Sequence, residues 1–196
     1  MALAPGLRDP VHDGQAVFRA VMEALARPGR IQPLAVPVAP PRPLTPELAA
    51  LALALADADA PVWLDPVLAE SEAVVRFLRF HTGAPVVAAP EAAVFALVAD
   101  PVRCPDFADF AQGEPAYPDR SATLVLAVET LAEEGGLVLE GPGIRGRAPL
   151  SAAPLPADFA ARMARNRAGF PLGIDLLLAA PGRLAGLPRS TRVTEA

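Results

Sequence analysis

Ala122-Thr123-Leu124-Val125-Leu126-Ala127-Val128 forms a continuous apolar run in the middle of the chain. A run of this length predicts a strand buried on both faces, which is typical of the centre of a sheet with parallel strands. Shorter runs at 60–64, 85–88, 93–98 and 137–140 predict further strands, the last entered through a turn at Gly135-Gly136. Residues 174–180 and 184–188 flank Pro181-Gly182 and predict a hairpin.

Helical patterns alternate with these strands. Residues 13–26 carry an apolar stripe that includes Phe18 and Met22, with Asp13 as the expected N-cap. Thr45 as N-cap and Pro46 in the first turn predict a second helix. Further helices are expected at 68–80 and 157–168, and a short helix or loop at 106–112. This order predicts an α/β fold in which helices flank a mixed sheet.

The chain is expected to be one domain spanning residues 1–196. Its 196 residues fit a single domain, and 53% of them are hydrophobic, enough for a sizeable core. The proline-rich segment 33–46 reads as a stiff connection inside that domain rather than as a linker between two.

Composition excludes several classes of protein. The net charge of −5 argues against nucleic-acid binding, which needs a basic surface. All 17 basic residues are arginine, so the chain lacks the lysine that pyridoxal-phosphate enzymes, P-loop NTPases and protein kinases require. The single cysteine, Cys104, allows no internal disulfide and fits a reducing compartment. We see no signal peptide and no apolar run long enough to span a bilayer, so we expect a cytoplasmic protein.

One short segment, Arg79-Phe80-His81-Thr82-Gly83, brings together the largest number of side chains that could bind an anion. Arg79, His81 and Thr82 together offer a cation, a titratable ring and a hydroxyl, which suits a phosphate or an acidic partner. The alternative is an ordinary helix end with Gly83 just beyond it. Arg189, in Pro188-Arg189-Ser190-Thr191-Arg192, is a similar candidate for phosphate binding, with a solvated tail as the alternative.

Other candidates are weaker. His12 and His81 are too far apart to form a metal pair, and the sequence predicts neither a metal site nor a catalytic residue. Cys104 has no catalytic signature around it. The glycine-rich segment 141–146 resembles a phosphate loop loosely, but Pro142 lacks a donor N–H and no helical pattern follows at once, so an ordinary strand-exit turn is the simpler interpretation. Phe107, Phe110 and Tyr117 lie in a stretch expected either to be an exposed contact loop or to fold its aromatics onto the core.

A set of short motifs in a fixed order resembles the H-subunit family of bacterial carbon–phosphorus lyase. They cover nearly the whole chain, from about Asp9 to Val193. The motifs include Ala26-Arg27-Pro28-Gly29, Ala56-Asp57-Ala58-Asp59-Ala60-Pro61-Val62-Trp63-Leu64, Leu78-Arg79-Phe80-His81-Thr82-Gly83, Gly141-Pro142-Gly143-Ile144, Phe170-Pro171-Leu172-Gly173-Ile174-Asp175 and Leu187-Pro188-Arg189-Ser190-Thr191.

The resemblance implies a role in phosphonate catabolism. It implies assembly with subunits G, I and J, a peripheral K subunit, and a homodimer when the protein is isolated. The family is required, with its partners, for transfer of ribose triphosphate from ATP to an alkylphosphonate. It also implies a fold similar to type I pyridoxal-phosphate-dependent transferases without that cofactor, or any other. The alternatives are a stand-alone phosphate- or phosphonate-binding protein and a homodimer that regulates assembly.

Overall fold

The computed structural model describes residues 3–35 and 37–196, and β7 (Thr123–Ala127) lies at its centre. This strand runs parallel to β4 (Phe95–Val98) on one side and to β10 (Asp175–Ala180) on the other. Leu124, Val125 and Leu126 are at most 1% exposed. The predicted central strand, buried on both faces, is therefore confirmed.

The central sheet is mixed, as predicted. Its order is β1-β11-β10-β7-β4-β2-β3, with β1 (Gln32–Pro33), β2 (Val62–Leu64), β3 (Val86–Val87) and β11 (Arg183–Leu187) completing the set. The expected hairpin is β10 and β11, which pair antiparallel around Pro181-Gly182. β1 is also antiparallel to β11, whereas β7, β4, β2 and β3 are parallel to their neighbours.

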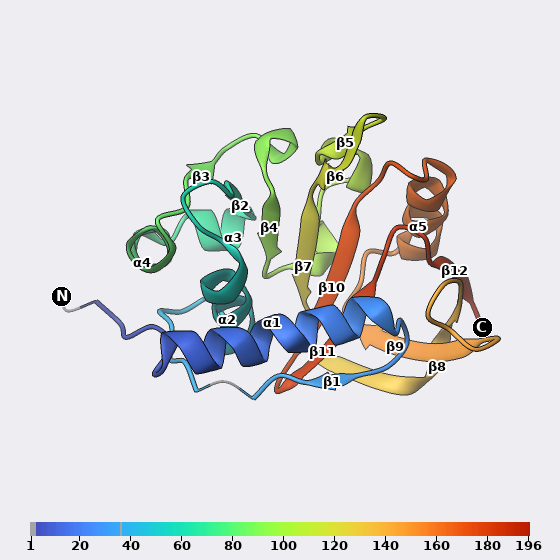
Figure 1. Cartoon of the computed structure of the whole chain (residues 1–196), viewed down its shortest axis with the longest axis horizontal. Helices are drawn as coiled ribbons and strands as arrows, with labels where there is room; N and C mark the ends of the chain where they lie inside the picture. Colours follow the sequence, from blue (N-terminus) through green and yellow to red (C-terminus); the bar gives the residue numbers. More distant parts are fainter. Residues whose placement is uncertain (1–2, 36) are drawn as a thin grey trace.

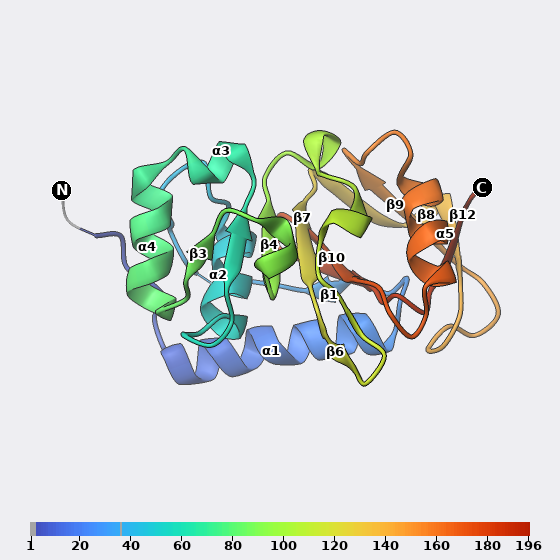
Figure 2. The ribbon, with the colours of Figure 1, turned by 90° about the horizontal axis from the view of Figure 1, so that it is seen from above.

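The sheet separates two apolar cores because successive side chains point to opposite faces. Val125 and Leu177 face α1 (Pro10–Ala26), α2 (Pro46–Leu55) and α4 (Glu72–Thr82). Leu124 and Leu178 face a second layer built from α5 (Phe159–Ala168) and from the small sheet β12-β8-β9. That layer lies at the end of the molecule opposite α4 (Figures 1 and 2). The chain thus forms an α/β domain in which secondary structure covers both faces of one sheet.

The other elements are shorter or peripheral. They are α3 (Pro66–Ala69), β5 (Gln112–Glu114), β6 (Tyr117–Ser121), β8 (Thr130–Glu140), β9 (Ala148–Ala153), β12 (Arg192–Glu195) and three 3-10 turns at Pro90–Ala92, Pro101–Arg103 and Phe107–Asp109. Among the described helices, none is both long and apolar enough to cross a bilayer.

Two helix starts show how the local chemistry acts. Thr45 caps α2 as predicted, since its Oγ1 accepts a hydrogen bond from Leu48 N at 3.2 Å. The predicted cap of α1 was wrong, because Asp9 is the N-cap and Asp13 lies in the first turn, accepting from Asp9 N at 2.9 Å. Asp9 Oδ1 also accepts from Val11 N and His12 N, so the two carboxylates together satisfy three backbone N–H groups at the helix start.

Two residues of the predicted apolar stripe of α1 are exposed. Val17 and Val21 are buried against the sheet, but Phe18 and Met22 are 51% and 52% exposed. Val11, 75% exposed, lies on the same side because positions seven and eleven residues apart share a helix face. α1 therefore carries an exposed apolar face, formed by Val11, Phe18 and Met22, beside its buried one.

Three other expectations are corrected. The helix expected at 68–80 is two helices, α3 and α4, because Ser71 caps a new start. Gly135 and Gly136 do not turn the chain into a strand; they take positive φ inside the long strand β8, where the register with β9 shifts. The C-terminal segment after Arg189 is not a solvated tail, since Thr191 is fully buried and β12 pairs with β8.

Phe107 and Phe110 are core residues. Each is 2% exposed, and they make edge contacts with Phe159 and Trp63 at ring-centroid distances of 6.0 and 5.4 Å. The contact-loop interpretation is therefore wrong for both, and the alternative of aromatics folded onto the core is confirmed for them. Tyr117 remains 49% exposed.

α1 lies unusually close to the sheet at Gly186. A Cβ atom at this position would lie 2.6 Å from the carbonyl carbon of Ala24, closer than any real Cβ contact. Only glycine lets the helix backbone rest on β11 at this distance. The position of α1 along the sheet is thereby fixed.

Candidate functional site

The predicted residues at the end of α4 are engaged in local structure. Thr82 Oγ1 donates to Leu78 O at 2.8 Å and accepts from Ala84 N at 3.0 Å. Gly83, with φ 72°, ends the helix and donates its N–H to Arg79 O. The helix-end arrangement is therefore the one observed, and Arg79 itself is exposed there.

His81 holds the segment before α1 (residues 3–9), which we call the N-terminal arm. Its Nε2 lies 2.9 Å from Ala4 O, and because a carbonyl oxygen only accepts, Nε2 carries the hydrogen. The ring packs on Phe77 and Phe80 with centroid distances of 4.6 and 5.1 Å. This histidine has a clear structural task in holding residues before α1 against α4.

Arg189 is held by a different set of partners. Its Nε donates to Asp175 Oδ1 at 3.2 Å and Nη2 to Asp175 Oδ2 at 2.6 Å, while Nη1 donates to Pro118 O and Pro171 O. Nη2 also donates to Ser121 Oγ. These contacts use all five N–H donors of a guanidinium. Arg189 therefore joins β6, β10 and the segment before β10, and has no donor left over.

The structure does not gather the four predicted residues into one site. Arg189 contacts Asp175, the first residue of β10, which lies near the middle of the seven-stranded sheet. Arg79, His81 and Thr82 are on α4, at one end of the molecule (Figure 2).

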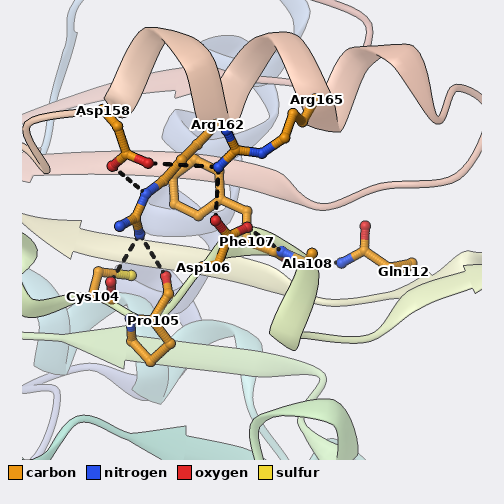
Figure 3. Close-up of polar contacts among 9 residues, drawn as sticks. All are labelled: Cys104, Pro105, Asp106, Phe107, Ala108, Gln112, Asp158, Arg162 and Arg165. Carbon is orange, nitrogen blue, oxygen red and sulfur yellow. Dashed lines mark hydrogen bonds and ion pairs between the residues drawn. The ribbon is translucent and has the colours of Figure 1, made fainter.

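A cluster that the sequence did not predict connects α5 to the segment around Cys104 (Figure 3). Arg162 Nε donates to Asp158 at 2.6 Å, and its Nη1 donates to the carbonyl oxygens of Cys104 and Pro105 at 2.8 Å each. Arg165 Nη2 bridges Asp106 at 2.7 Å and Asp158 at 3.5 Å. The cluster fastens α5 over the buried Phe107.

The ionisable groups of this cluster are suited to stabilising the fold and not to catalysing a reaction. The hydrogen bond from Arg162 lowers the pKa of Asp158, and the Ala108 N–H lowers the pKa of Asp106. Burial raises the pKa of the Cys104 thiol to about 12. Cys104 is therefore a protonated, buried thiol near neutral pH and a poor nucleophile.

The glycine-rich segment 141–146 lies in the loop between β8 and β9 (residues 141–147), where Ile144 N donates to Gly141 O at 3.2 Å. The segment is a strand-exit turn, as the simpler of the two interpretations predicted, and the element that follows it is strand β9. The structure nevertheless brings it against Arg27-Pro28-Gly29-Arg30 at the end of α1, and the two segments line a cleft of about 330 Å³. We call this the arginine cleft, lined by Arg27, Arg30, Arg145, Arg147 and Glu133 among others.

Sequence reasoning named both segments but did not place them together. They are more than 110 residues apart in the chain, and contacts at that distance leave no local periodicity. The available signal was their presence in the same ordered set of family motifs.

Comparison with known proteins identifies the family. Residues 5–194 match the family described as bacterial phosphonate metabolism protein (PhnH). The chain is 45% identical over 187 residues to the alpha-D-ribose 1-methylphosphonate 5-triphosphate synthase subunit PhnH of Rhizobium meliloti (strain 1021), covering 94% of this chain and 92% of the relative. It is 33% identical over 180 residues to a relative from Stutzerimonas stutzeri named as a C-P lyase subunit protein, HtxG, covering 91% and 85%. The chain belongs to the PhnH family of bacterial phosphonate metabolism proteins.

Proposed function

We propose that this chain is a non-autonomous subunit of the carbon–phosphorus lyase core complex, acting in the cytoplasm. With its partners it is required for transfer of ribose triphosphate from ATP to an alkylphosphonate such as methylphosphonate, with release of adenine. The transferase activity belongs to the assembly. The observation that carries this proposal is the 45% identity, over 94% of the chain, to a relative named as a subunit of the ribose methylphosphonate triphosphate synthase.

The chemistry of the described side chains agrees with a dependent role. The Cys104 thiol is buried with its pKa raised to about 12, His81 is bonded to Ala4 O, and the donors of Arg189 are all used inside the fold. A nucleophile or general base needs a free, suitably ionised group. These groups support stability, so we assign the reacting groups to partner chains.

The partners that we propose are subunits G, I and J, with K at the periphery. The exposed apolar face of α1, formed by Val11, Phe18 and Met22, supports such an assembly, because interface cores are enriched in phenylalanine and methionine. We assign this face to a partner subunit in the complex. In the isolated protein a second copy of the chain is the competing occupant, which fits the proposed homodimer.

We further propose that the domain, residues 1–196, is similar in fold to type I pyridoxal-phosphate-dependent transferases and works without that cofactor. The mixed sheet between two layers supports the similarity, and the absence of lysine from the sequence supports the loss of the cofactor.

Reconstitution tests the proposed function. The chain is co-expressed with subunits G, I, J and K, and with the L subunit for the assay, and adenine release is measured by chromatography from ATP and methylphosphonate. We expect a stable complex and adenine release that stops when this chain is omitted. Turnover by the purified chain alone, or full activity without it, would contradict the proposal. A monodisperse dimer that never binds the other subunits would favour the homodimer alternative.

A further inference from the structure

The arginine cleft is a concave site that the assembly role does not explain. It lies where the C-terminal end of α1 meets the loop between β8 and β9, far from α4. Its volume of about 330 Å³ falls in the range of small-molecule sites. Figure 2 shows this loop at the end of the molecule that also holds α5 and the C-terminus.

Two glycines fix the walls of the cleft. Gly143, with φ 80°, packs so tightly that a Cβ would meet Ala26 O. Gly29, with φ 85°, lies so close to β9 that a Cβ would come within 2.7 Å of Ala148 Cβ. Both require a glycine for conformation and for space. The two loops therefore interlock, and the cleft is preformed.

The charge of the cleft opposes the charge of the protein. Four arginines and one glutamate line it, although the whole chain carries a net charge of −5. Glu133 is committed to the fold, since its carboxylate accepts from Ile31 N and from Arg30 Nη1, both at 2.8 Å. These bonds lower the pKa of Glu133, so it keeps its charge and holds Arg30 in place.

The arginines keep donors available. Arg30 and Arg147 each bind one carboxylate, yet their side chains stay 70% and 77% exposed. Arg27 pairs with Glu23 at 3.2 Å and is 66% exposed. Arg145 makes no hydrogen bond or ion pair within residues 3–35 and 37–196. Several of the arginines that line this one small volume thus keep N–H donors unused.

We propose that the arginine cleft binds the phosphoryl oxygens of a small phosphorylated or phosphonylated molecule. A guanidinium presents its donors as a planar fork that matches phosphate and phosphonate oxygens, and several around one cleft favour a ligand with more than one negative charge. The same chemistry occurs in a triphosphate and in an alkylphosphonate. This inference deepens the proposed function. It rests on that function only for the choice between a triphosphate and an alkylphosphonate as the ligand.

Binding to the purified chain tests the proposal. Isothermal titration uses tripolyphosphate, ATP, methylphosphonate and inorganic phosphate as separate ligands at low ionic strength. We expect saturable binding of tripolyphosphate, weakened at least about tenfold by R145A and further by R145A/R147A, since one hydrogen bond to a charged group contributes about 1.5–3 kcal/mol. Tighter binding of ATP than of methylphosphonate would identify the triphosphate as the source, and the reverse order would identify the phosphonate.

The controls separate the cleft from other sites. Arg76→Ala removes an exposed arginine from α4, at the other end of the molecule, and we expect it to leave binding unchanged. Circular dichroism and the urea midpoint show whether each variant is folded. Binding unchanged in folded R145A/R147A, or lost in R79A instead, would overturn the proposal, and so would tighter binding of an oligoglutamate peptide than of tripolyphosphate.

Failure here and failure of the proposed function are distinguishable. If the complex assembles and releases adenine but the cleft binds no phosphoryl ligand, only this inference falls. If the chain binds tripolyphosphate through Arg145 but never joins subunits G, I and J, the proposed function falls and the site stands.

Discussion

Removing Asp175 should destabilise the fold strongly, because it leaves Arg189 charged and poorly solvated. The side chain of Arg189 is 13% exposed and that of Asp175 is 23% exposed. Three hydrogen bonds connect them, from the backbone N, Nε and Nη2 of Arg189, at 2.8, 3.2 and 2.6 Å. Truncating one member of a buried ion pair costs roughly 3–5 kcal/mol, and the partial exposure of Asp175 places Asp175→Ala near 3 kcal/mol.

Urea unfolding monitored by tryptophan fluorescence measures this cost. Trp63 is the single tryptophan and is 7% exposed, so its emission reports exposure of the core. With an m-value of about 2–3 kcal/mol/M, the midpoint of Asp175→Ala should fall by about 1 M or more. The double variant D175L/R189M should recover much of the loss, because both charges are removed together.

Two results would refute this reasoning. A loss below about 1 kcal/mol for Asp175→Ala would show that the pair does not support the fold. Phosphate or tripolyphosphate that raises the melting temperature of the native protein but not that of R189M would show that Arg189 binds an anion, as the sequence suggested.

Three further outcomes follow from burial and exposure. The Cys104 thiol should react with Ellman's reagent at pH 8 only after unfolding. Burial raises its pKa from 9.0 to about 12, so its contribution to the free energy of unfolding should be complete below pH 9 and decline between pH 9 and 12. Urea unfolding at a series of pH values measures this decline. Phe107→Ala should cost about 3–5 kcal/mol in urea unfolding, whereas Tyr117→Ala should cost less than about 0.5 kcal/mol; equal costs would contradict the assignment of Phe107 to the core. F18S/M22S should leave the isolated chain folded by circular dichroism, because neither side chain is buried in its core, and should reduce co-purification with the partner subunits; undiminished co-purification would exclude this face of α1 from the interface.

The sequence predicts the central elements well because their signals are local. The run 122–128 became β7, and Thr45 with Pro46 started α2. The hairpin of β10 and β11 followed from its Pro-Gly turn. The fourth helix also formed within two residues of its expected start.

The failures arise where tertiary packing decides. Phe18 satisfied the helical period of α1 but lies outside the face that meets the sheet, which periodicity alone cannot reveal. β9 and β12 were missed because their apolar alternation is weak and their pairing with β8 is non-local.

The candidate site was predictable only in parts. Arg79, His81 and Thr82 drew attention by chemical type, yet a helix end and an anchored arm account for the contacts of His81 and Thr82. The arginines of the cleft were visible as residues, but their convergence depends on the contact between Gly143 and the end of α1. A contact between residues so far apart in the chain can be recognised only once the backbone is folded.

The close approach of α1 to Gly186 bears on how fast a ligand would enter the arginine cleft. A helix that cannot slide along β11 holds the backbone of Arg27 and Arg30, which follow its last residue, in one place before any ligand arrives. Entry then requires no gating motion, and the association rate is set by diffusion and by attraction to the guanidinium groups. We therefore expect added salt to slow association much more than it speeds release, with single-exponential kinetics throughout.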